Sequence, residues 1–401
     1  MKTIKLLSIS MLIAFTFNAM AQLTWTQKAD FYSVRTETFA FTIGNYGYVG
    51  NGTDGPNYNT DLFQWDPTNN TWTQKASMPS LGKAKAACFT IDSLGYTVGG
   101  ATYSGVGLNS DETWSYSPTS NSWTQKVSYP TIVSGACAFV IGNYAYVGLG
   151  MTTVDNYFNT FYRFDPVGNS FTAIAPFPGN ARCMAFAFTI NGKGYVGAGQ
   201  SYSGGSYIFY KDMWEYDPTT NSWTQKADFP PIARGFVAGW SINNIGYAGL
   251  GWNTPFNIFG DLWAYIPTNN TWQQMNTPDG FPRFAVGAFS IGNKGYVATG
   301  RVASSTYIKE FWEFLPAADI GINENKAVSV SSTISDNQLY LFGLAPLENI
   351  KSVQLIEPSG KLIKQWKYEF NSTYDVSGLT SGLYFVQLEM KHGIRVAKVL
   401  K

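Results

Sequence analysis

The sequence predicts an all-β protein whose first three quarters repeat a single structural unit. Three observations predict this class. Two short aromatic motifs recur at a step of about 49 residues, large and small side chains alternate within each copy, and Gly, Asn and Pro separate the alternating runs. Alternation with a period of two is typical of β-strands, and a fixed period of this length is typical of repeat architectures.

The first motif is a tyrosine in a Gly-Tyr-Val-Gly-like sequence, which we call the motif tyrosine. Its six copies are Tyr48, Tyr96, Tyr146, Tyr195, Tyr247 and Tyr296, separated by 48, 50, 49, 52 and 49 residues. The second motif reads Asn-(Thr/Ser)-Trp and recurs at Trp72, Trp123, Phe171, Trp223 and Trp272. A sixth copy at Trp25 lacks the Asn. The two motifs are out of phase, because the chain begins with a Trp copy and the repeats end with a Tyr copy.

Aligning the copies on the motif tyrosine defines a first strand in each unit. An aromatic residue stands seven positions earlier in every copy, an isoleucine five positions earlier, and a small residue eight positions earlier. In the first copy these are Phe41, Ile43 and Ala40. A strand with no polar face is buried on both sides, so large residues of one unit are expected to meet small residues of the next.

Turn signals complete each unit. Pairs such as Gly44-Asn45 favour tight hairpins between the first strand and the tyrosine strand. A variable loop of about 8–12 residues follows, which is longer than a hairpin needs. A third, aromatic strand then ends near a proline such as Pro67 or Pro218, and the Trp motif forms the fourth strand. Each unit is therefore predicted to be a four-stranded antiparallel meander.

Six four-stranded units predict a six-bladed β-propeller over residues 22–316. The phase offset predicts that the strand at Leu23–Lys28 completes the last sheet and closes the ring. These motifs resemble the Kelch-repeat family, whose marks are a glycine pair after the tyrosine strand, an aromatic-rich strand and Asn-x-Trp. Only the second unit keeps the pair, Gly99-Gly100; the others read Gly-x-Gly or, in the last unit, lose the first glycine.

The N-terminus predicts an export signal. Residues 1–21 combine Lys2 and Lys5 with an apolar run and end in Ala19-Met20-Ala21, a small-x-small cleavage site. The apolar run is shorter than the ~20 residues that span a membrane, so we expect no transmembrane segment. The mature chain is expected to be secreted or displayed at the outer cell surface after passing through the periplasm.

The composition changes after Pro316. Residues 317–325 are predicted to be a linker, and residues 326–401 a small Ig-like β-sandwich. Its strands are predicted at the short alternating runs Gln338–Leu344, Val353–Ile356, Leu362–Lys367, Leu383–Met390 and Arg395–Lys401. Here the chain resembles the type A C-terminal sorting domain of the type IX secretion system, in the runs at Val353–Lys361, Tyr374–Leu379, Ser381–Val386 and Ala397–Lys401. A Pro-Asn-Pro motif is missing at the front. The resemblance implies the type IX machinery as a partner, a source among the Bacteroidota, and removal of the domain after export in some cases.

Composition excludes several function classes. Lys and Arg number 27 against 26 Asp and Glu, so the field needed to bind nucleic acid is missing. The one histidine, His392, lies in the sorting domain, which excludes His triads and His-based metal sites in the repeats. We therefore predict no catalytic triad, no metal and no cofactor. The three cysteines cannot form a complete disulfide framework, and the chain is expected to be a monomer.

The second-strand loops and the loops entering each blade are expected to share one face of the propeller. A basic residue stands 13 positions before the motif tyrosine in every unit except the third, which has Val133. Arginine and aromatic planes suit sugars or extended peptides. The predicted ligand-binding residues are Arg35, Arg182, Arg234, Arg283, Tyr103, Tyr157, Tyr202, Tyr207, Trp252 and Tyr307.

A structural interpretation competes with this one. Kelch-type arginines often join blade to blade, and the loop aromatics can serve packing alone. Acidic residues recur before the third strand in five units, as in Asp212 and Asp261, which favours a repeated structural hydrogen bond. Cys88, Cys137 and Cys183 fall in or beside small-residue positions and are expected in the core.

Two hypotheses for function remain at this point. The first is an exported binding module for a glycan or an extracellular protein. The second is a metal-independent carbohydrate-active enzyme, such as a sugar epimerase or lyase, which Arg, Asp and Glu side chains could serve. The copper ligands of galactose oxidase and the repeated boxes of sialidases are missing from the sequence.

Overall fold

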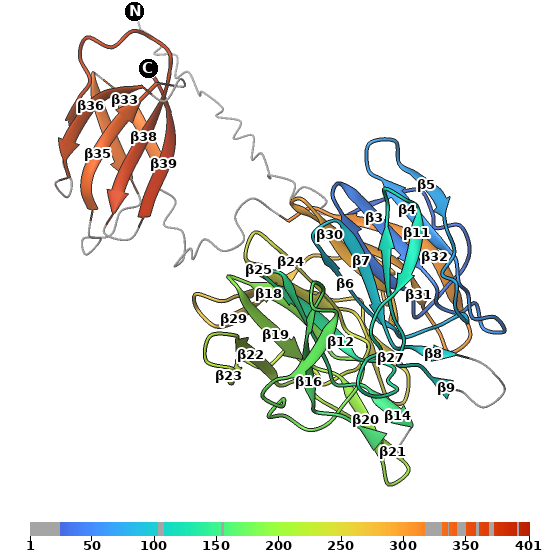
Figure 1. Cartoon of the computed structure of the whole chain (residues 1–401). Coiled ribbons are helices and arrows are strands. Elements are labelled where there is room, and N and C mark those ends of the chain that lie inside the picture. Colours follow the sequence, from blue (N-terminus) through green and yellow to red (C-terminus); the bar gives the residue numbers. More distant parts are fainter. Residues whose placement is uncertain are drawn as a thin grey trace, which may run out of the picture. The chain divides into compact units, whose positions relative to one another are not determined.

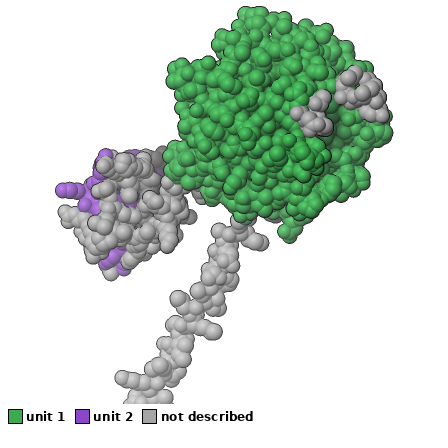
Figure 2. All heavy atoms as spheres, turned by 90° about the horizontal axis from the view of Figure 1, so that it is seen from below, with its two compact units in different colours: residues 1–321 green, residues 322–401 purple. Residues whose placement is uncertain are grey.

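The computed structural model describes residues 25–102, 108–153, 156–316, 331–335, 337–342, 350–357, 361–368, 373–390 and 393–401. The chain divides into two compact units, residues 1–321 and 322–401 (Figure 2). Four features named in the sequence analysis lie outside these residues. They are the predicted signal peptide (1–21), the predicted linker (317–325), Tyr103 and His392. The described residues contain no helix that is long and apolar enough to cross a membrane.

The first unit is built from six four-stranded antiparallel sheets among its described residues, here called blades 1 to 6 (Figure 1). Blades 1 and 2 contain β2 (Phe39–Ile43), β3 (Tyr46–Gly50), β4 (Leu62–Asp66), β5 (Thr71–Lys75), β6 (Ala87–Ile91), β7 (Leu94–Val98), β10 (Thr113–Ser117) and β11 (Ser122–Gln125). Blades 3 and 4 contain β12 (Cys137–Ile141), β13 (Tyr144–Gly148), β16 (Phe161–Asp165), β17 (Ser170–Ala173), β18 (Phe186–Ile190), β19 (Lys193–Gly197), β22 (Met213–Asp217) and β23 (Ser222–Lys226).

Blade 6 joins the two ends of the repeat region. Blades 5 and 6 contain β24 (Ala238–Ile242), β25 (Ile245–Gly249), β28 (Leu262–Ile266), β29 (Thr271–Met275), β30 (Gly287–Ile291), β31 (Lys294–Arg301), β32 (Tyr307–Phe314) and β1 (Trp25–Gln27). The strand β1 pairs with β32, with Trp25 opposite Phe314. The predicted closure by the N-terminal strand is therefore confirmed.

The innermost strands form a closed ring. Each contacts the next, from β2 through β6, β12, β18 and β24 to β30, and β30 contacts β2 again. This arrangement and the all-antiparallel pairing confirm the predicted all-β propeller. Because the ring closes on itself, the inner sheet edges are covered by neighbouring blades and do not present free ladder groups.

Aromatic side chains explain the repeated sequence pattern. The residue seven positions before each motif tyrosine lies directly opposite it in the antiparallel register, as Phe188 does opposite Tyr195. The two rings stack with their centroids 5.7 Å apart. The glycine before the motif tyrosine leaves room for this layer, because a Cβ on Gly246 would lie 2.3 Å from the Phe188 ring of the preceding blade. The predicted meeting of large and small residues across blades is thus confirmed.

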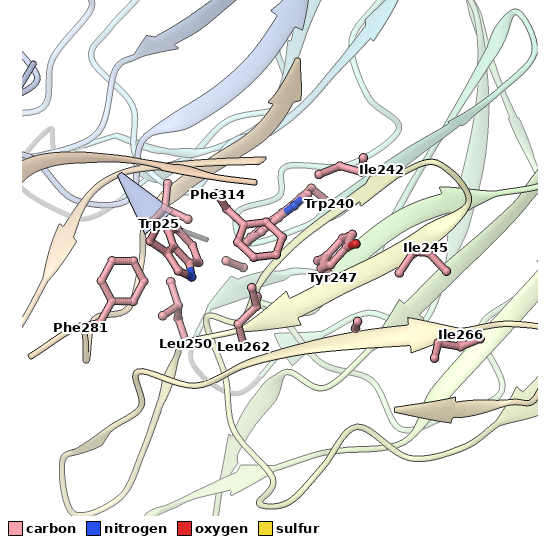
Figure 3. Packing of buried hydrophobic residues seen from close by; sticks show 13 residues of the cluster. Trp25, Trp240, Ile242, Ile245, Tyr247, Leu250, Leu262, Ile266, Phe281 and Phe314 are labelled. Carbon is pink, nitrogen blue, oxygen red and sulfur yellow. The ribbon is translucent and has the colours of Figure 1, made fainter. Parts of the chain in front are cut away.

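The ring-closing interface shows the same packing with residues from both chain ends. Trp25 of β1 lies against Phe281 and Phe314, with ring centroids 4.7 and 5.0 Å apart (Figure 3). Trp240 and Tyr247 of blade 5 complete the cluster. Burial of large aromatic side chains contributes strongly to folding free energy, so the blade 5 to blade 6 interface is held by its core.

Among the described residues, four short two-stranded ribbons rise from the loops after the second strands. They are β8 (Ala101–Thr102) with β9 (Leu108–Asn109), β14 (Met151–Thr153) with β15 (Asn156–Tyr157), β20 (Gln200–Ser203) with β21 (Ser206–Phe209), and β26 (Trp252–Asn253) with β27 (Asn257–Ile258). The ribbon strands that Figure 1 labels lie at one end of the propeller; they are β8, β9, β14, β20, β21 and β27. In blade 6 the same excursion is made by the long strands β31 and β32 themselves.

The described residues of the second unit form two sheets around one apolar cluster. One sheet has β33 (Ser331–Ser335), β34 (Gln338–Phe342) and β37 (Tyr374–Asp375), and the other has β36 (Leu362–Lys367), β35 (Ile350–Ile356), β38 (Leu383–Met390) and β39 (Gly393–Leu400). Leu339 of the first sheet and Val386 of the second share the buried core. Five of these strands were predicted from the sequence; β33 and β37 were not, and the Ig-like arrangement stays a prediction.

Candidate functional site

The repeated basic residues form a buried layer of ion pairs. Arg234 is fully buried, and its Nη1 and Nη2 atoms donate to the two carboxylate oxygens of Asp261 at 2.5 and 2.9 Å. The same Nη1 also donates to the Leu250 carbonyl at 3.2 Å. Arg35–Asp61 and Arg182–Asp212 form the same two-bond fork, whereas Lys83–Glu112 and Arg283–Glu310 occupy the equivalent positions with one hydrogen bond each between the charged groups. Paired forks of this kind are the strong form of the charge-assisted hydrogen bond.

Aromatic residues close this layer from both sides. The Arg234 guanidinium lies over the rings of Phe259 and Phe229, 3.8 and 5.1 Å from their centroids. The indole of Trp263 donates to the second carboxylate oxygen of Asp261 at 2.8 Å. Blade 3 has neither half of the pair, since Val133 and Thr160 occupy the two positions. The cation and the carboxylate are thus lost together, as expected for two parts of one structural device.

The electrostatics of the layer follow from burial and pairing. Burial alone would raise the pKa of Asp212, but the hydrogen bonds and charge of Arg182 outweigh it and lower that pKa below 3.8. Burial lowers the pKa of Arg283, against the opposing effect of Glu310. The repeated acidic residues therefore make the structural hydrogen bonds that the sequence suggested.

The four arginines predicted to bind a ligand all belong to this layer. Arg35, Arg182, Arg234 and Arg283 are 2%, 1%, 0% and 2% exposed. Tyr210 and Phe259, two of the loop aromatics, lie over Arg182 and Arg234. Their pairing accounts for why these residues recur, while a direct ligand contact by any of the four arginines stays a prediction.

A second set of repeated positions is different in every blade. The residues 11 positions before the motif tyrosines are Glu37, Lys85, Gly135, Met184, Phe236 and Ala285, which we call the mouth ring. All six have positive φ, between 55° and 66°. Five backbone hydrogen bonds of 2.8–3.1 Å join ring neighbours, for example from the Lys85 amide to the Glu37 carbonyl. They border a hollow lined by residues of all six blades.

Non-glycine residues at positive φ are uncommon and cluster at functional sites. Here the backbone geometry is repeated while the side chains are not: the ring is charged in blades 1 and 2 and apolar in blades 4 and 5. Sequence reasoning missed these residues, because no single residue type recurs at the position. The feature of the sequence that could have indicated them is that the residue type 11 positions before the motif tyrosine differs in every blade.

Above the mouth ring lies a cavity of about 710 Å³. Four of the predicted binding residues line it: Tyr157, Tyr202, Tyr207 and Trp252. The structure adds residues that were not predicted, namely Glu37, Lys85, Met151, Met184, Gln200, Phe236, Phe256, Phe284, Arg301 and Ser304. Tyr307 does not line the cavity but contacts Arg301, whose guanidinium carbon is 5.0 Å from the Tyr307 ring centroid.

The cavity has an aromatic wall formed by blades 4 to 6. Trp252 lies at its centre, with ring centroids 5.3 Å from Tyr207 and 5.9 Å from both Phe256 and Phe284. Trp252 is mostly buried, whereas Tyr207 and Phe256 are exposed. An apolar surface of flat rings with exposed edges is suited to stacking a ligand.

The cavity floor carries one acid and one base. The Lys85 Nζ atom lies 3.6 Å from a Glu37 carboxylate oxygen, and both side chains are at most a quarter exposed. The negative charge of Glu37 raises the pKa of Lys85, against the opposing effect of burial. Lys85 is therefore a firmly protonated cation, and Glu37 is the one carboxylate among the described cavity-lining residues.

None of the three free cysteines is among the described residues that line this cavity, although Cys183 pairs with the lining residue Gln200 through two backbone hydrogen bonds. Cys137 and Cys183 are buried, and burial raises the pKa of each thiol to about 12. Cys88 is half-buried and donates to the Ala40 carbonyl at 3.0 Å. Buried thiols with raised pKa are unreactive, so the core role expected for the cysteines agrees with their surroundings.

Comparison with known proteins gives matches in both units. Residues 329–401 match the family described as secretion system C-terminal sorting domain. Kelch-like protein 23 of Homo sapiens is 29% identical over 213 residues, which is 52% of this chain and 36% of that protein. N-acetylneuraminate epimerase of Pasteurella multocida is 33% identical over 111 residues, or 27% of this chain and 28% of that protein.

The chain thus spans between about a quarter and little more than a third of the length of these curated relatives. Among solved structures, the one described as "Structure of YjhT" aligns with a TM-score of 0.61 and 16% identity, covering 70% of this chain and 95% of that one. An identity this low shows a shared fold alone.

Proposed function

Since the chain joins a Kelch-type propeller to a C-terminal secretion sorting domain and is exported, we propose that its propeller binds a glycan in the cavity above the mouth ring. The type IX secretion machinery is the partner of the C-terminal domain in this proposal. The propeller is then the part that acts outside the cell or at its surface.

The observation that carries the proposal is the aromatic wall beside polar groups in one cavity. A volume of about 710 Å³ falls within the usual range for small-ligand sites. Flat rings can stack on the apolar face of a sugar, while Glu37, Lys85 and Gln200 offer hydrogen bonds to its hydroxyls. A concave site of this size fits one or two sugar rings better than the broad surface of a folded protein.

The test is a glycan array screened with the full exported protein, followed by titration of the bound glycans. Tyr207→Ala removes an exposed wall residue and is expected to weaken binding about fivefold, the equivalent of roughly 1 kcal/mol of stacking energy. Tyr32→Ala is the matched control, because Tyr32 is an exposed aromatic that stacks on Phe63 and does not line the cavity. Binding only to extracellular proteins would contradict the glycan proposal.

A second candidate function is a metal-independent sugar epimerase or lyase. The Glu37–Lys85 pair on the cavity floor favours it, because a carboxylate and a protonated amine are the groups that acid–base chemistry on a sugar requires. Four of the similar proteins are named N-acetylneuraminate epimerases. Incubation with N-acetylneuraminate and amino sugars, followed by NMR of the anomeric signals, tests this function. Identical spectra for the wild type and Glu37→Gln would exclude catalysis by Glu37.

A further inference from the structure

Arg301 differs from the arginines of the ion-pair layer. It ends strand β31 and lines the cavity, and its Nη2 atom donates to the Ser304 carbonyl and, at 3.4 Å, to the Tyr307 hydroxyl. Its guanidinium lies over Phe284, 5.6 Å from the ring centroid. Among the described residues no carboxylate is within ion-pair distance of it, and its Nε atom is buried without a partner. Arg301 is therefore a cation of the cavity lining that has no carboxylate partner among the described residues.

Two further lining residues have buried polar atoms without a partner among the described residues. These atoms are the indole Nε1 of Trp252 and the side-chain Oε1 of Gln200. Both side chains are more than nine-tenths buried. A buried donor or acceptor that makes no hydrogen bond costs about 1–3 kcal/mol, so such atoms are rare unless something else satisfies them. Two residues of the cavity lining therefore carry buried polar atoms whose hydrogen bonds are not made within the described residues.

The charge of the described cavity lining is unbalanced by one unit. Lys85 and Arg301 are cations and Glu37 is the anion, so the formal sum is 2 − 1 = +1. Lys85 and Glu37 already pair with each other, which leaves Arg301 as the uncompensated charge. A single negative charge on a ligand would neutralise the cavity, whereas a doubly charged group would face repulsion from Glu37.

We propose that the cavity selects a sugar carrying one negative charge, a carboxylate or a sulfate ester, and that Arg301 binds this group. The proposal rests on the glycan-binding function proposed above and names the ligand class of that site. A guanidinium fork matches the planar pair of oxygens of a carboxylate and also binds sulfate. The sugar ring lies against the aromatic wall around Trp252.

The test is titration calorimetry of the full exported protein with three matched sugars: galacturonate, galactose 6-sulfate and galactose. We expect at least one anionic sugar to bind ten or more times more tightly than galactose, with an affinity that falls as salt is added. Arg301→Gln is expected to reduce the preference for that sugar over galactose to about twofold or less, measured as the ratio of the two affinities. Arg301→Lys keeps the charge and is expected to restore part of it, which separates recognition from misfolding.

Lys309→Gln is the matched control, because Lys309 lies on β32, is half exposed and does not line the cavity. This variant is expected to keep the preference. Preference for galacturonate alone identifies the carboxylate as the ligand group, and preference for galactose 6-sulfate alone identifies the sulfate. Equal binding of all three sugars, or an unchanged preference in Arg301→Gln, would overturn this inference and leave glycan binding intact. Failure of every sugar on the array and in titration would overturn both.

Discussion

The ion-pair layer and the mouth ring lie on the same blade-entry segments but obey opposite rules. Two positions separate them in each blade, as Arg234 and Phe236 show. The layer repeats the same cation–carboxylate pair in five blades, and blade 3 loses both partners at once. The mouth ring keeps its backbone conformation in all six blades and varies every side chain. A side-chain pair that recurs in the blades therefore indicates a structural requirement of the fold. A position with a recurring backbone conformation but different side chains can form a specific site.

The largest expected effect comes from breaking the layer. Arg234→Met keeps most of the side-chain volume but leaves Asp261, which is about one-fifth exposed, without its guanidinium. Removing one partner of a buried pair costs about 3–5 kcal/mol, and we expect the lower end of that range in the free energy of unfolding. Urea unfolding followed by tryptophan fluorescence measures it. Lys211→Met, which breaks a half-exposed pair at 3.6 Å, should cost less than about 1 kcal/mol.

A loss below about 1 kcal/mol in Arg234→Met would contradict the structural role of the layer. It would also reopen direct ligand binding as the reason for the repeated arginines.

The layer should also give the propeller a dependence on acid. The folded-state pKa of Asp212 is lowered below 3.8, and those of Glu112 and Glu310 are lowered below 4.5. A lowered folded-state pKa means that the unfolded chain binds more protons, so stability is present above the unfolded values and is lost as pH falls through the folded values. We expect stability to be flat near neutral pH and to fall below about pH 4.

Urea midpoints measured from pH 7 to pH 3 test this dependence. Asp212→Asn should be less stable than the wild type at pH 7 and should show a shallower decline toward pH 3. Parallel pH curves for the two proteins would show that Asp212 does not contribute to the acid sensitivity.

The smallest expected effect on stability comes from the mouth ring. Glu37→Gln keeps the side-chain shape and removes one charge of a pair whose atoms are 3.6 Å apart and whose lysine is about a quarter exposed, so the loss is expected to be smaller than for the close Arg234–Asp261 pair with its fully buried guanidinium. The variant should therefore lose less stability than Arg234→Met, as judged by the same urea experiment. A loss as large as that of Arg234→Met would show that the mouth ring is also structural and would remove the contrast between the two sets.

The sorting domain shows which strands can be predicted from the alternation of apolar and polar residues alone. Strands with clear alternation, such as Leu362–Lys367 and Leu383–Met390, were predicted with the bounds that the structure has. The short strand Tyr374–Asp375 was missed, because two residues pairing with β34 leave no periodic signal. Its existence depends on a partner strand more than thirty residues earlier in the chain.

In the propeller, the sequence alone determined the repeat, the aromatic and small positions of each inner strand, and closure by the N-terminal strand at Trp25. These features can be recognised in the sequence because the same packing contacts recur in six blades and therefore require the same residue types at the same spacing. The tertiary structure decided which loop residues meet. It placed Tyr157, Tyr202, Tyr207 and Trp252 around one cavity, with Arg301 and the Glu37–Lys85 pair.

The physical reason lies in where each set of contacts comes from. The ion-pair layer joins residues within one blade, such as Arg234 and Asp261, so its spacing recurs along the chain. The cavity joins single residues from blades 1 to 6, and their meeting follows only from the closed ring. Charge balance at Arg301 is likewise a property of neighbours in space, which no spacing in the sequence encodes.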